Sequence, residues 1–281
     1  MILNNTKQFL KRLDLNVAYA CNIQCRGCIS LSDFDRRGVV TDQEIDTWLK
    51  YWSSVLDIGT ITLFGGEPLI NPELIKICKT IRHYYPTTTI RLITNGYLLH
   101  KIEHSVWFDF EPFEIQVSIH RLDHETQINN QIKKILSVKK GWKTSVDNPI
   151  LHQQILFELP RFKIYKSKFK DFVAPYRLEK QKLRPFSSDP AKAHSICGSP
   201  NTPVLYKGKL YKCPPVANLI DITNENWNNY HACSDATGLK EFISQVNVPE
   251  TVCSQCPESF SQHSYNHFDT GNVYVKQKNI S

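Results

Sequence analysis

The stretch Cys21–Cys28 constrains the fold more than any other part of the chain. Its sequence is Cys-Asn-Ile-Gln-Cys-Arg-Gly-Cys, which places three cysteines at C-x3-C-x2-C spacing. Thiolates this close together can converge on one soft metal centre. Most iron–sulfur sites use four cysteines, so a triplet without a fourth cysteine nearby indicates a four-iron cluster with one open iron. A zinc knuckle or a chance group of core cysteines could also give this pattern, although zinc sites usually show paired C-x2-C units and four ligands.

The residues around the triplet predict where it lies. Residues 13–19 alternate at first between apolar and polar side chains, which is typical of a strand. The cysteines then occupy the loop at the strand's C-terminal end, where barrel-type α/β folds keep their chemistry. A second predicted strand, Thr60–Phe64, ends in Gly65-Gly66-Glu67-Pro68. The two glycines allow the backbone to approach a ligand closely, and the carboxylate of Glu67 can hold an ammonium group.

The cysteine triplet and this turn, some forty residues apart, resemble those of the radical S-adenosylmethionine (SAM) family. The resemblance implies that Cys21, Cys25 and Cys28 hold a [4Fe-4S] cluster whose open iron binds the amino and carboxylate groups of SAM. It also implies that an electron from the cluster cleaves SAM to methionine and a 5′-deoxyadenosyl radical. One departure is Gly27, where the family usually has an aromatic residue. The SAM-binding residues that the resemblance implies are Gly65, Gly66, Glu67, Thr94, Asn95 and Ser118.

The first half of the chain alternates predicted strands with predicted helices. A capping box at Thr41–Glu44 opens one helix, and Asn71 as N-cap with Pro72 opens the next. This alternation predicts an α/β fold with a parallel sheet and outer helices, and the resemblance implies a partial (β/α)6 barrel. Residues 155–159 and 162–165 look like strands that complete the barrel, but the strand assignment between residues 141 and 176 stays open.

A second cysteine group follows a predicted linker at residues 185–190. Cys197 and Cys213 flank a predicted hairpin with Gly208 at its turn, and Cys253 and Cys256 follow at C-x2-C spacing. Four thiolates can ligate either a second cluster or a structural zinc ion. The framework resembles the auxiliary-cluster domain called SPASM in its shortened form, the twitch domain, and implies one auxiliary [4Fe-4S] cluster. We therefore expect a radical SAM barrel over residues 1–184 and a small auxiliary-cluster domain over residues 185–281.

Composition narrows the setting of the protein. No apolar run in the 281 residues reaches the ~18–20 residues of a membrane span, and the N-terminus lacks a secretory apolar region, so we expect no membrane association and a cytoplasmic location. The nine cysteines fall in metal-like groups, which favours metal ligation over disulfides. The net charge of +7 could attract an anionic substrate. A solvated surface is the preferred interpretation, and nucleic acid is not expected as a partner.

Three functional hypotheses follow. In the first, the chain is a radical SAM oxidoreductase, similar to the dehydrogenases that oxidise an amino-cyclitol alcohol, which abstracts hydrogen from a small sugar- or cyclitol-like substrate with help from the auxiliary cluster. In the second, the substrate is a peptide or protein side chain. In the third, the chain is a non-catalytic iron–sulfur binding or sensing module. An external electron donor such as flavodoxin or ferredoxin is implied for the enzyme. The candidates for a substrate base are His120, Arg161, Lys163 and Lys166.

Overall fold

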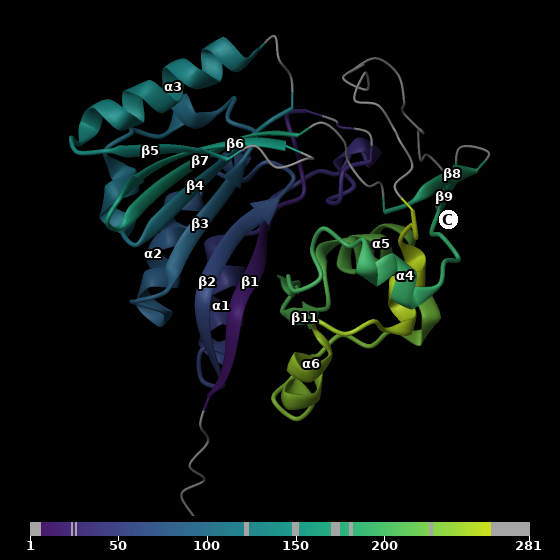
Figure 1. The fold of residues 1–281 in the computed structure, drawn as a ribbon. Coiled ribbons are helices and arrows are strands. Elements are labelled where there is room, and N and C mark those ends of the chain that lie inside the picture. Colours follow the sequence, from purple (N-terminus) through teal and green to yellow (C-terminus); the bar gives the residue numbers. More distant parts are fainter. Residues whose placement is uncertain are drawn as a thin grey trace, which may run out of the picture.

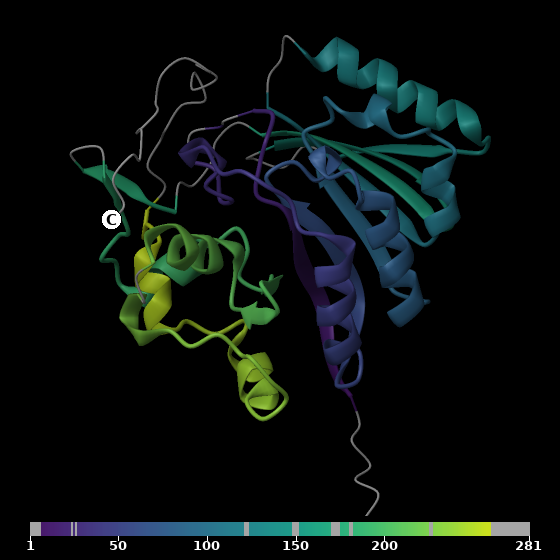
Figure 2. The same ribbon diagram turned by 180° about the vertical axis from the view of Figure 1, so that it is seen from behind.

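The computed structural model describes residues 7–23, 25, 27–120, 124–147, 152–169, 175–179, 182–224 and 227–259. These residues form an α/β structure with a large, mostly parallel sheet, which confirms the predicted fold class. Figures 1 and 2 show helices against one face of the sheet and a smaller C-terminal part beside the sheet's first strand.

Five neighbouring parallel strands form the middle of the sheet. The strands predicted at residues 13–19 and 60–64 are both present, each with bounds a few residues away from those predicted. The register runs from strand to strand without interruption apart from one bulge between Asn16 and Ala18. In spatial order the strands are β1 (Gln8–Ala18), β2 (Leu56–Gly65), β3 (Thr89–Thr94), β4 (Phe113–Ile119) and β7 (Phe162–Phe169).

The sheet closes on one side with an antiparallel meander. β5 (Lys143–Asp147) pairs with β6 (His152–Leu159), and β6 pairs with β7. The strands predicted at residues 155–159 and 162–165 are therefore present, but as a hairpin. Only two residues join β6 to β7, and a parallel crossover needs a dozen or more, so this short turn forces the antiparallel arrangement in place of a further strand–helix unit.

Three helices cover one face of the sheet (Figure 1): α1 (Asp42–Trp52), α2 (Leu74–Tyr84) and α3 (Glu125–Val138). The predicted capping box is confirmed, since Thr41 and Glu44 exchange hydrogen bonds at the start of α1. α2 begins later than predicted, after Glu73. Asn71 instead donates its side-chain amide to the carbonyls of Val17 and Val40, at 2.8 Å each. It thus links the connection before α2 to the end of β1.

Short 3-10 turns supply the other connections in this half of the chain. Between β3 and β4 the described residues form two such turns and no α-helix. The turns are η1 (Ser32–Phe34), η2 (Pro68–Ile70), η3 (Leu99–Lys101) and η4 (Val106–Phe110).

The core lies between the sheet and these helices. Alternate residues of each parallel strand, such as Leu13 and Leu15 of β1, are buried in one continuous cluster with Leu49 of α1 and Ile77 of α2. The period of two in a strand therefore directs the residues in between, such as Asp14 and Asn16, to the opposite face. Cys78 is buried in this cluster as well.

The C-terminal part extends the same sheet. The predicted hairpin around Gly208 is confirmed, and Gly208 has a φ of +79° at its turn. Its first strand pairs in parallel with β1, so the sheet order is β11-β10-β1-β2-β3-β4-β7-β6-β5. The elements of this part are β8 (Arg177–Glu179), β9 (Lys182–Arg184), α4 (Pro190–Ser195), β10 (Val204–Tyr206), β11 (Lys209–Tyr211), α5 (Pro214–Thr223), η6 (Trp227–Asn229), α6 (Leu239–Gln245) and η7 (Thr251–Gln255).

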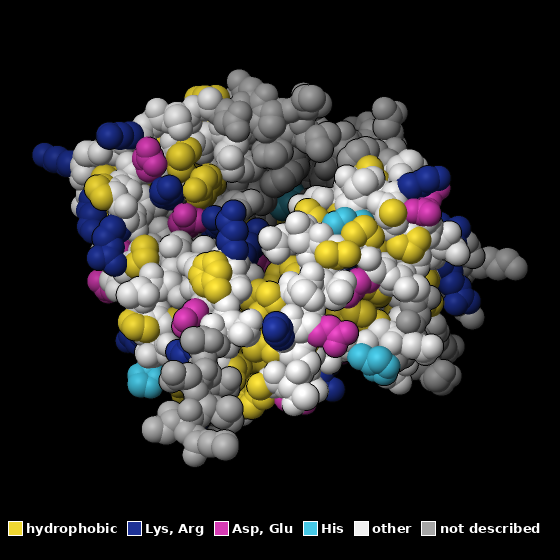
Figure 3. Space-filling view, turned by 60° about the horizontal axis from the view of Figure 1, so that its bottom comes forward, with side chains coloured by type: hydrophobic (Ala, Val, Ile, Leu, Met, Phe, Trp, Pro, Cys, Tyr) yellow, Lys and Arg dark blue, Asp and Glu magenta, His cyan; other side chains and the backbone are white. Residues whose placement is uncertain are grey.

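Two further features of the molecule are the charge on its surface and the length and apolar character of its helices. In the space-filling view of Figure 3, Lys and Arg side chains are interspersed with Asp and Glu, and apolar side chains lie along the junction between the two parts. None of the helices in the described ranges combines the length and the apolar character that crossing a bilayer requires.

Candidate functional site

The cysteine triplet lies in the loop that follows β1, at the C-terminal edge of the parallel strands. The loops after β2 and β3 lie at the same edge because neighbouring parallel strands end on the same side. The triplet therefore meets the Gly65–Pro68 turn and the Thr94–Gly96 turn. This edge brings together three of the motifs that the sequence analysis singled out.

The three thiols of the triplet are partly buried and close to one another. Burial is the main cause that raises the pKa of Cys21 to about 12, and it also raises the pKa of Cys25 and Cys28. Charge on Cys28 raises the pKa of Cys21 further, and charge on both of these raises that of Cys25. Three thiols grouped in a dehydrated loop need a positive partner to ionise together, which a metal centre supplies.

Gly65 and Gly66 allow the turn after β2 to lie against the end of β1. A Cβ atom on Gly65 would come within 2.2 Å of the Ala18 carbonyl oxygen, and one on Gly66 within 2.1 Å of the Ala20 carbonyl oxygen. The backbone of this turn also donates to those carbonyls, from Gly66 to Ala18 at 2.8 Å and from Glu67 to Ala20 at 2.9 Å. Only glycine permits this approach. The two glycines therefore hold the turn after β2 against the residues that directly precede the cysteine triplet.

Glu67 is buried and its carboxylate joins two loops. Oε1 accepts from the Leu69 amide at 3.0 Å and from the Thr94 hydroxyl at 2.7 Å, and Oε2 accepts from the Asn95 amide at 2.8 Å. Burial raises the pKa of Glu67 to about 7 in spite of these three donors. A carboxylate has about four acceptor positions, so one remains for a further donor.

Asn95 connects the third loop to the cysteines. Its side-chain amide nitrogen lies 2.8 Å from the Asn22 side-chain oxygen and 3.8 Å from the Cys21 sulfur. Its side-chain oxygen accepts from the Tyr97 amide at 3.1 Å. The structure therefore brings Thr94 and Asn95, two of the predicted SAM-binding residues, into contact with Glu67 and with the triplet.

Ser118 and His120 lie at the C-terminal end of β4. Ser118 is 6% exposed and pairs in register with Ser167 of β7, on the sheet face opposite the helices. Burial lowers the pKa of His120 to about 4. The imidazole is therefore neutral at physiological pH, which suits an acceptor better than a cation.

The three basic candidates for a substrate base are not brought to this edge. Arg161 precedes β7, so it lies at the opposite edge of the sheet, and its guanidinium reaches the carbonyl of Glu111 at 3.3 Å. Lys163 is the second residue of β7 and lies 4.0 Å from Glu158. Lys166 points to the helix side and pairs with Glu125 of α3 at 2.8 Å. The direction of β7 and the alternation of its side chains separate these cations from the cysteine loop.

The second cysteine group is also assembled. Cys213 precedes the first turn of α5, Cys197 follows α4, and Cys253 and Cys256 lie in and just after η7. Burial is the main cause that raises the pKa of Cys213, and charge on the other three thiols raises it further. The segment before α4 lies along η7, with backbone bonds from Phe186 to Gln255 and from Ser188 to Ser254 at 2.9 Å each.

Lys212, next to Cys213, is a buried lysine that connects the elements around the second cysteine group. Its side chain is 6% exposed. The ammonium donates to the carbonyls of Gln245 and Val248 at 2.6 and 2.7 Å and pairs with Glu250 at 3.2 Å. A buried ammonium with carbonyl and carboxylate acceptors is satisfied, so Lys212 ties the end of α6 and the start of η7 to the hairpin. The sequence analysis missed this role, because a lysine in a hairpin is usually exposed.

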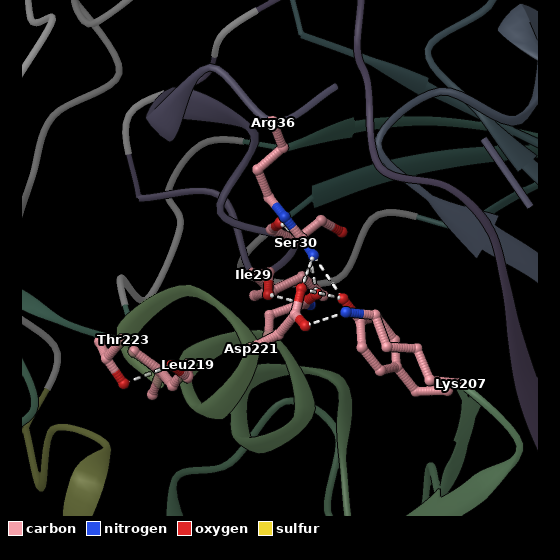
Figure 4. Close-up of polar contacts among 9 residues, drawn as sticks. Ile29, Ser30, Arg36, Lys207, Leu219, Asp221 and Thr223 are labelled. Atoms are coloured by element: carbon pink, nitrogen blue, oxygen red, sulfur yellow. Dashed lines mark hydrogen bonds and ion pairs between the residues drawn. The ribbon is translucent and has the colours of Figure 1, made fainter. Parts of the chain in front are cut away.

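Arg36 links the segment after the cysteine triplet to α5, the helix that follows Cys213 (Figure 4). Its guanidinium lies 2.9 Å from Asp221 of α5 and also donates to the Asn218 side-chain oxygen, at 2.5 Å. On the other side it donates to the Ser30 carbonyl at 3.1 Å. It further contacts the Tyr206 hydroxyl, and its side chain is 7% exposed. The sequence analysis did not find this link, since Asn218 and Asp221 lie more than 180 residues from Arg36 in the chain.

The donor sets decide what the two groups can hold. Within the described part of the chain, no three or more His, Cys, Asp or Glu residues are arranged to hold a single metal ion. A zinc ion needs each thiolate at about 2.3 Å from one point, whereas a four-iron cluster binds each thiolate through a different iron. By donor type both cysteine groups suit a soft metal centre, either zinc or an iron–sulfur cluster.

The fold and this edge define a class: an α/β protein with a parallel sheet that carries a three-cysteine loop after its first strand. Residues 15–148 match the family model described as Radical SAM superfamily. The chain therefore contains a radical SAM superfamily domain. Proteins of this superfamily bind SAM and a [4Fe-4S] cluster, so the domain implies both.

Curated relatives share this domain. The chain is 30% identical over 118 residues to a GTP 3',8-cyclase of Microcystis aeruginosa, covering 41% of this chain and 36% of the relative. It is 26% identical over 179 residues to a GTP 3',8-cyclase of Aquifex aeolicus, covering 58% of this chain and 55% of the relative. The chain thus spans about half or less of the length of these relatives.

One solved structure is similar over most of its length. The crystal structure of BtrN in complex with AdoMet and 2-DOIA superposes with a TM-score of 0.54 at 17% identity, covering 89% of this chain and 94% of that chain. At this identity the likeness concerns the fold.

Proposed function

We propose that the chain is a radical SAM enzyme that reductively cleaves SAM and abstracts hydrogen from a small polar substrate, which it oxidises with help from an auxiliary cluster. The observation that carries the proposal is the meeting of the cysteine triplet, the Gly65-Gly66-Glu67 turn and Asn95 at one edge of the sheet. The cluster and SAM, when bound, supply the electron and the 5′-deoxyadenosyl radical. The rest of the chemistry belongs to the chain's own residues.

In this proposal Cys21, Cys25 and Cys28 hold the cluster, and the turn after β2 holds the methionine end of SAM. The backbone of Gly65 and Gly66 lies close to the triplet, and the Glu67 carboxylate retains one acceptor position for an ammonium group. Asn95 orients the loop from the other side through Asn22. Ser118 lies beside Ser167 on the sheet face opposite the helices.

The sheet face opposite the helices indicates the substrate class. In the two rows nearest the cysteine loop, β1–β4 and β7 present uncharged side chains in the described structure: Asn16, Phe64, Ile93, Gln116, Tyr165, Ser118 and Ser167. Amide, hydroxyl and phenol groups of this kind hydrogen-bond to the hydroxyls of a sugar- or cyclitol-like ring. This face therefore favours a polyhydroxylated substrate without phosphate groups.

The next row on that face carries charges, but they alternate in sign and are paired. In register across the sheet it contains Asp14, Thr62, Arg91, Glu114 and Lys163. Arg91 lies 2.6 Å from Glu114, and Asp14 lies 2.7 Å from Arg12. A polyphosphate needs cations that are free to bind it, and these are already bound to carboxylates.

A second candidate function is the cyclisation of a nucleoside triphosphate, which the names of the curated relatives favour. The paired charges argue against it. The hypotheses of a peptide side chain as substrate and of a non-catalytic iron–sulfur module also stay open. BtrN was crystallised with AdoMet and 2-DOIA, and it shares the fold over most of this chain. This likeness in fold is its only support for a small-molecule substrate.

The proposal is tested with anaerobically reconstituted protein, SAM and a chemical reductant. We expect 5′-deoxyadenosine to form, and to form in the Cys233→Ala control, whose cysteine lies outside both groups. The triple variant with Cys21, Cys25 and Cys28 changed to Ala should form none. Deuterated aminocyclitol and deuterated GTP are then compared by the transfer of deuterium into 5′-deoxyadenosine. Transfer from the aminocyclitol supports the proposal, and transfer from GTP alone contradicts the proposed substrate class.

A further inference from the structure

Asp33 and Tyr176 meet at the backbone of Gly27, the residue directly before Cys28. The Gly27 amide lies 3.0 Å from the Tyr176 hydroxyl and 3.2 Å from Asp33 Oδ2. The Tyr176 hydroxyl in turn donates to the same carboxylate oxygen. Gly27 has a φ of +77°, so these contacts hold a left-handed turn that carries the last cysteine of the triplet.

The carboxylate is held in a dehydrated place close to the triplet. Tyr176 is 5% exposed and packs edge-on against Phe34, with ring centroids 5.0 Å apart. Asp33 Oδ2 lies 3.2 Å from the Gly27 amide, one residue before Cys28, which places the carboxylate beside the last cysteine of the triplet. Charges interact more strongly in such surroundings than in water.

We infer that Asp33, held in place by Tyr176, lowers the reduction potential of the cluster bound at Cys21, Cys25 and Cys28. This inference rests on the proposed function. Reduction adds an electron to the cluster, and a fixed negative charge beside it opposes that addition. The potentials of iron–sulfur clusters vary with net charge, hydrogen bonds and exposure. A lower potential makes the reduced cluster a stronger electron donor, as reductive cleavage of SAM requires. The Tyr176 hydroxyl moderates the effect, because its hydrogen bond withdraws part of the carboxylate's charge.

The test is a redox titration of the full, reconstituted chain monitored by electron paramagnetic resonance. It follows the signal that changes on addition of SAM, which separates the first cluster from the second. Asp33→Asn keeps the side chain's shape and removes its charge. We expect it to favour the reduced cluster about tenfold, which is ~59 mV upward for one electron. The matched control is Asp35→Asn, which makes the same change at an exposed carboxylate paired with Arg37. It should leave the potential unchanged.

Tyr176→Phe should shift the reduction potential in the opposite direction. It retains the negative charge but removes the donor, so the potential should fall. It also keeps the inference testable if Asp33→Asn does not retain its cluster. No shift in Asp33→Asn beyond that of Asp35→Asn, or an unchanged or raised potential in Tyr176→Phe, overturns the inference. A parent protein without a SAM-sensitive cluster signal is a different result: it contradicts the proposed function, and this inference with it.

Discussion

At the scale of single residues, close approach and burial decide what the motifs can do. Gly66 leaves room for the Ala20 carbonyl, and Glu67 buries a carboxylate against three donors. The backbone contact fixes the turn after β2, and the carboxylate ties that turn to the loop after β3. The same four residues that resemble a SAM-binding motif therefore also hold the site together before any ligand binds.

The raised pKa of Glu67 predicts a pH-dependent stability. A pKa of about 7 in the folded protein exceeds the ordinary value of 4.5. The folded state therefore binds the proton more tightly, and stability falls as the pH rises from about 4.5 to 7. A shift of this size is worth on the order of 3 kcal/mol. Urea denaturation of the cluster-free protein between pH 4.5 and 8 should show this fall, and Glu67→Gln should remove it. Equal pH slopes in both proteins would contradict the prediction.

Gly66→Ala should damage the turn without any change of charge. The added methyl would overlap the Ala20 carbonyl, so the backbone must shift, at a cost of roughly 1–3 kcal/mol. The free energy of unfolding and the iron content after reconstitution should both fall. Gly238→Ala is the control, since a Cβ atom there meets nothing within 4 Å. Parent-like stability and iron content in Gly66→Ala would show that the turn is not held as described.

At the scale of elements, α5 is tied to the segment that follows the cysteine triplet. Asp221 and Asn218 of α5 bind the Arg36 guanidinium, and Asn218 also donates to the Ile29 carbonyl at 3.2 Å. Lys207 at the hairpin turn pairs with Asp221 as well. Since Cys213 lies at the start of α5, one helix connects the second cysteine group to the loop of the first.

Arg36→Ala should therefore destabilise the protein strongly. It leaves Asp221 without its buried partner, and removing one member of a buried pair typically costs 3–5 kcal/mol. Asp221 is partly exposed and keeps Lys207, which places the expected loss of unfolding free energy at about 3 kcal/mol. Arg37→Ala is the control, because Arg37 is exposed and its pair with Asp35 lies in water, so a change within about 0.5 kcal/mol is expected. Similar losses in the two variants, measured by urea denaturation, would refute the role of Arg36.

At the scale of the whole molecule, two cysteine groups lie in parts that share one sheet. β10 pairs with β1, so the C-terminal part continues the strand order of the first part. The boundary proposed near residue 184 therefore separates the two cysteine groups, but the sheet continues across it. Four cysteines on one cluster would leave no iron open to substrate, which makes the second cluster an electron acceptor in our proposal.

The two-cluster proposal predicts about eight irons per chain, four at each group. Changing Cys253 and Cys256 together to Ala should reduce this to about four. The variant should still form 5′-deoxyadenosine from SAM, yet fail to complete oxidation of the substrate, because the electron acceptor is missing. Iron and zinc analysis with product assays checks both parts, again with Cys233→Ala as control. One cluster with stoichiometric zinc, or a redox-neutral product, would rule out the auxiliary role.

Sequence alone determined the local features: the cysteine spacing, the Gly-Gly-Glu turn, the capping box at Thr41 and the alternation of strands with helices. Each depends on residues a few positions apart, whose geometry is set by backbone sterics and by the period of the element. Only the tertiary structure decided that Tyr176 reaches Gly27, that Arg36 binds α5, that Lys166 points away from the site and that β10 lies beside β1. These contacts join segments that are far apart in the chain, and they depend on strand register and direction, which no local pattern specifies.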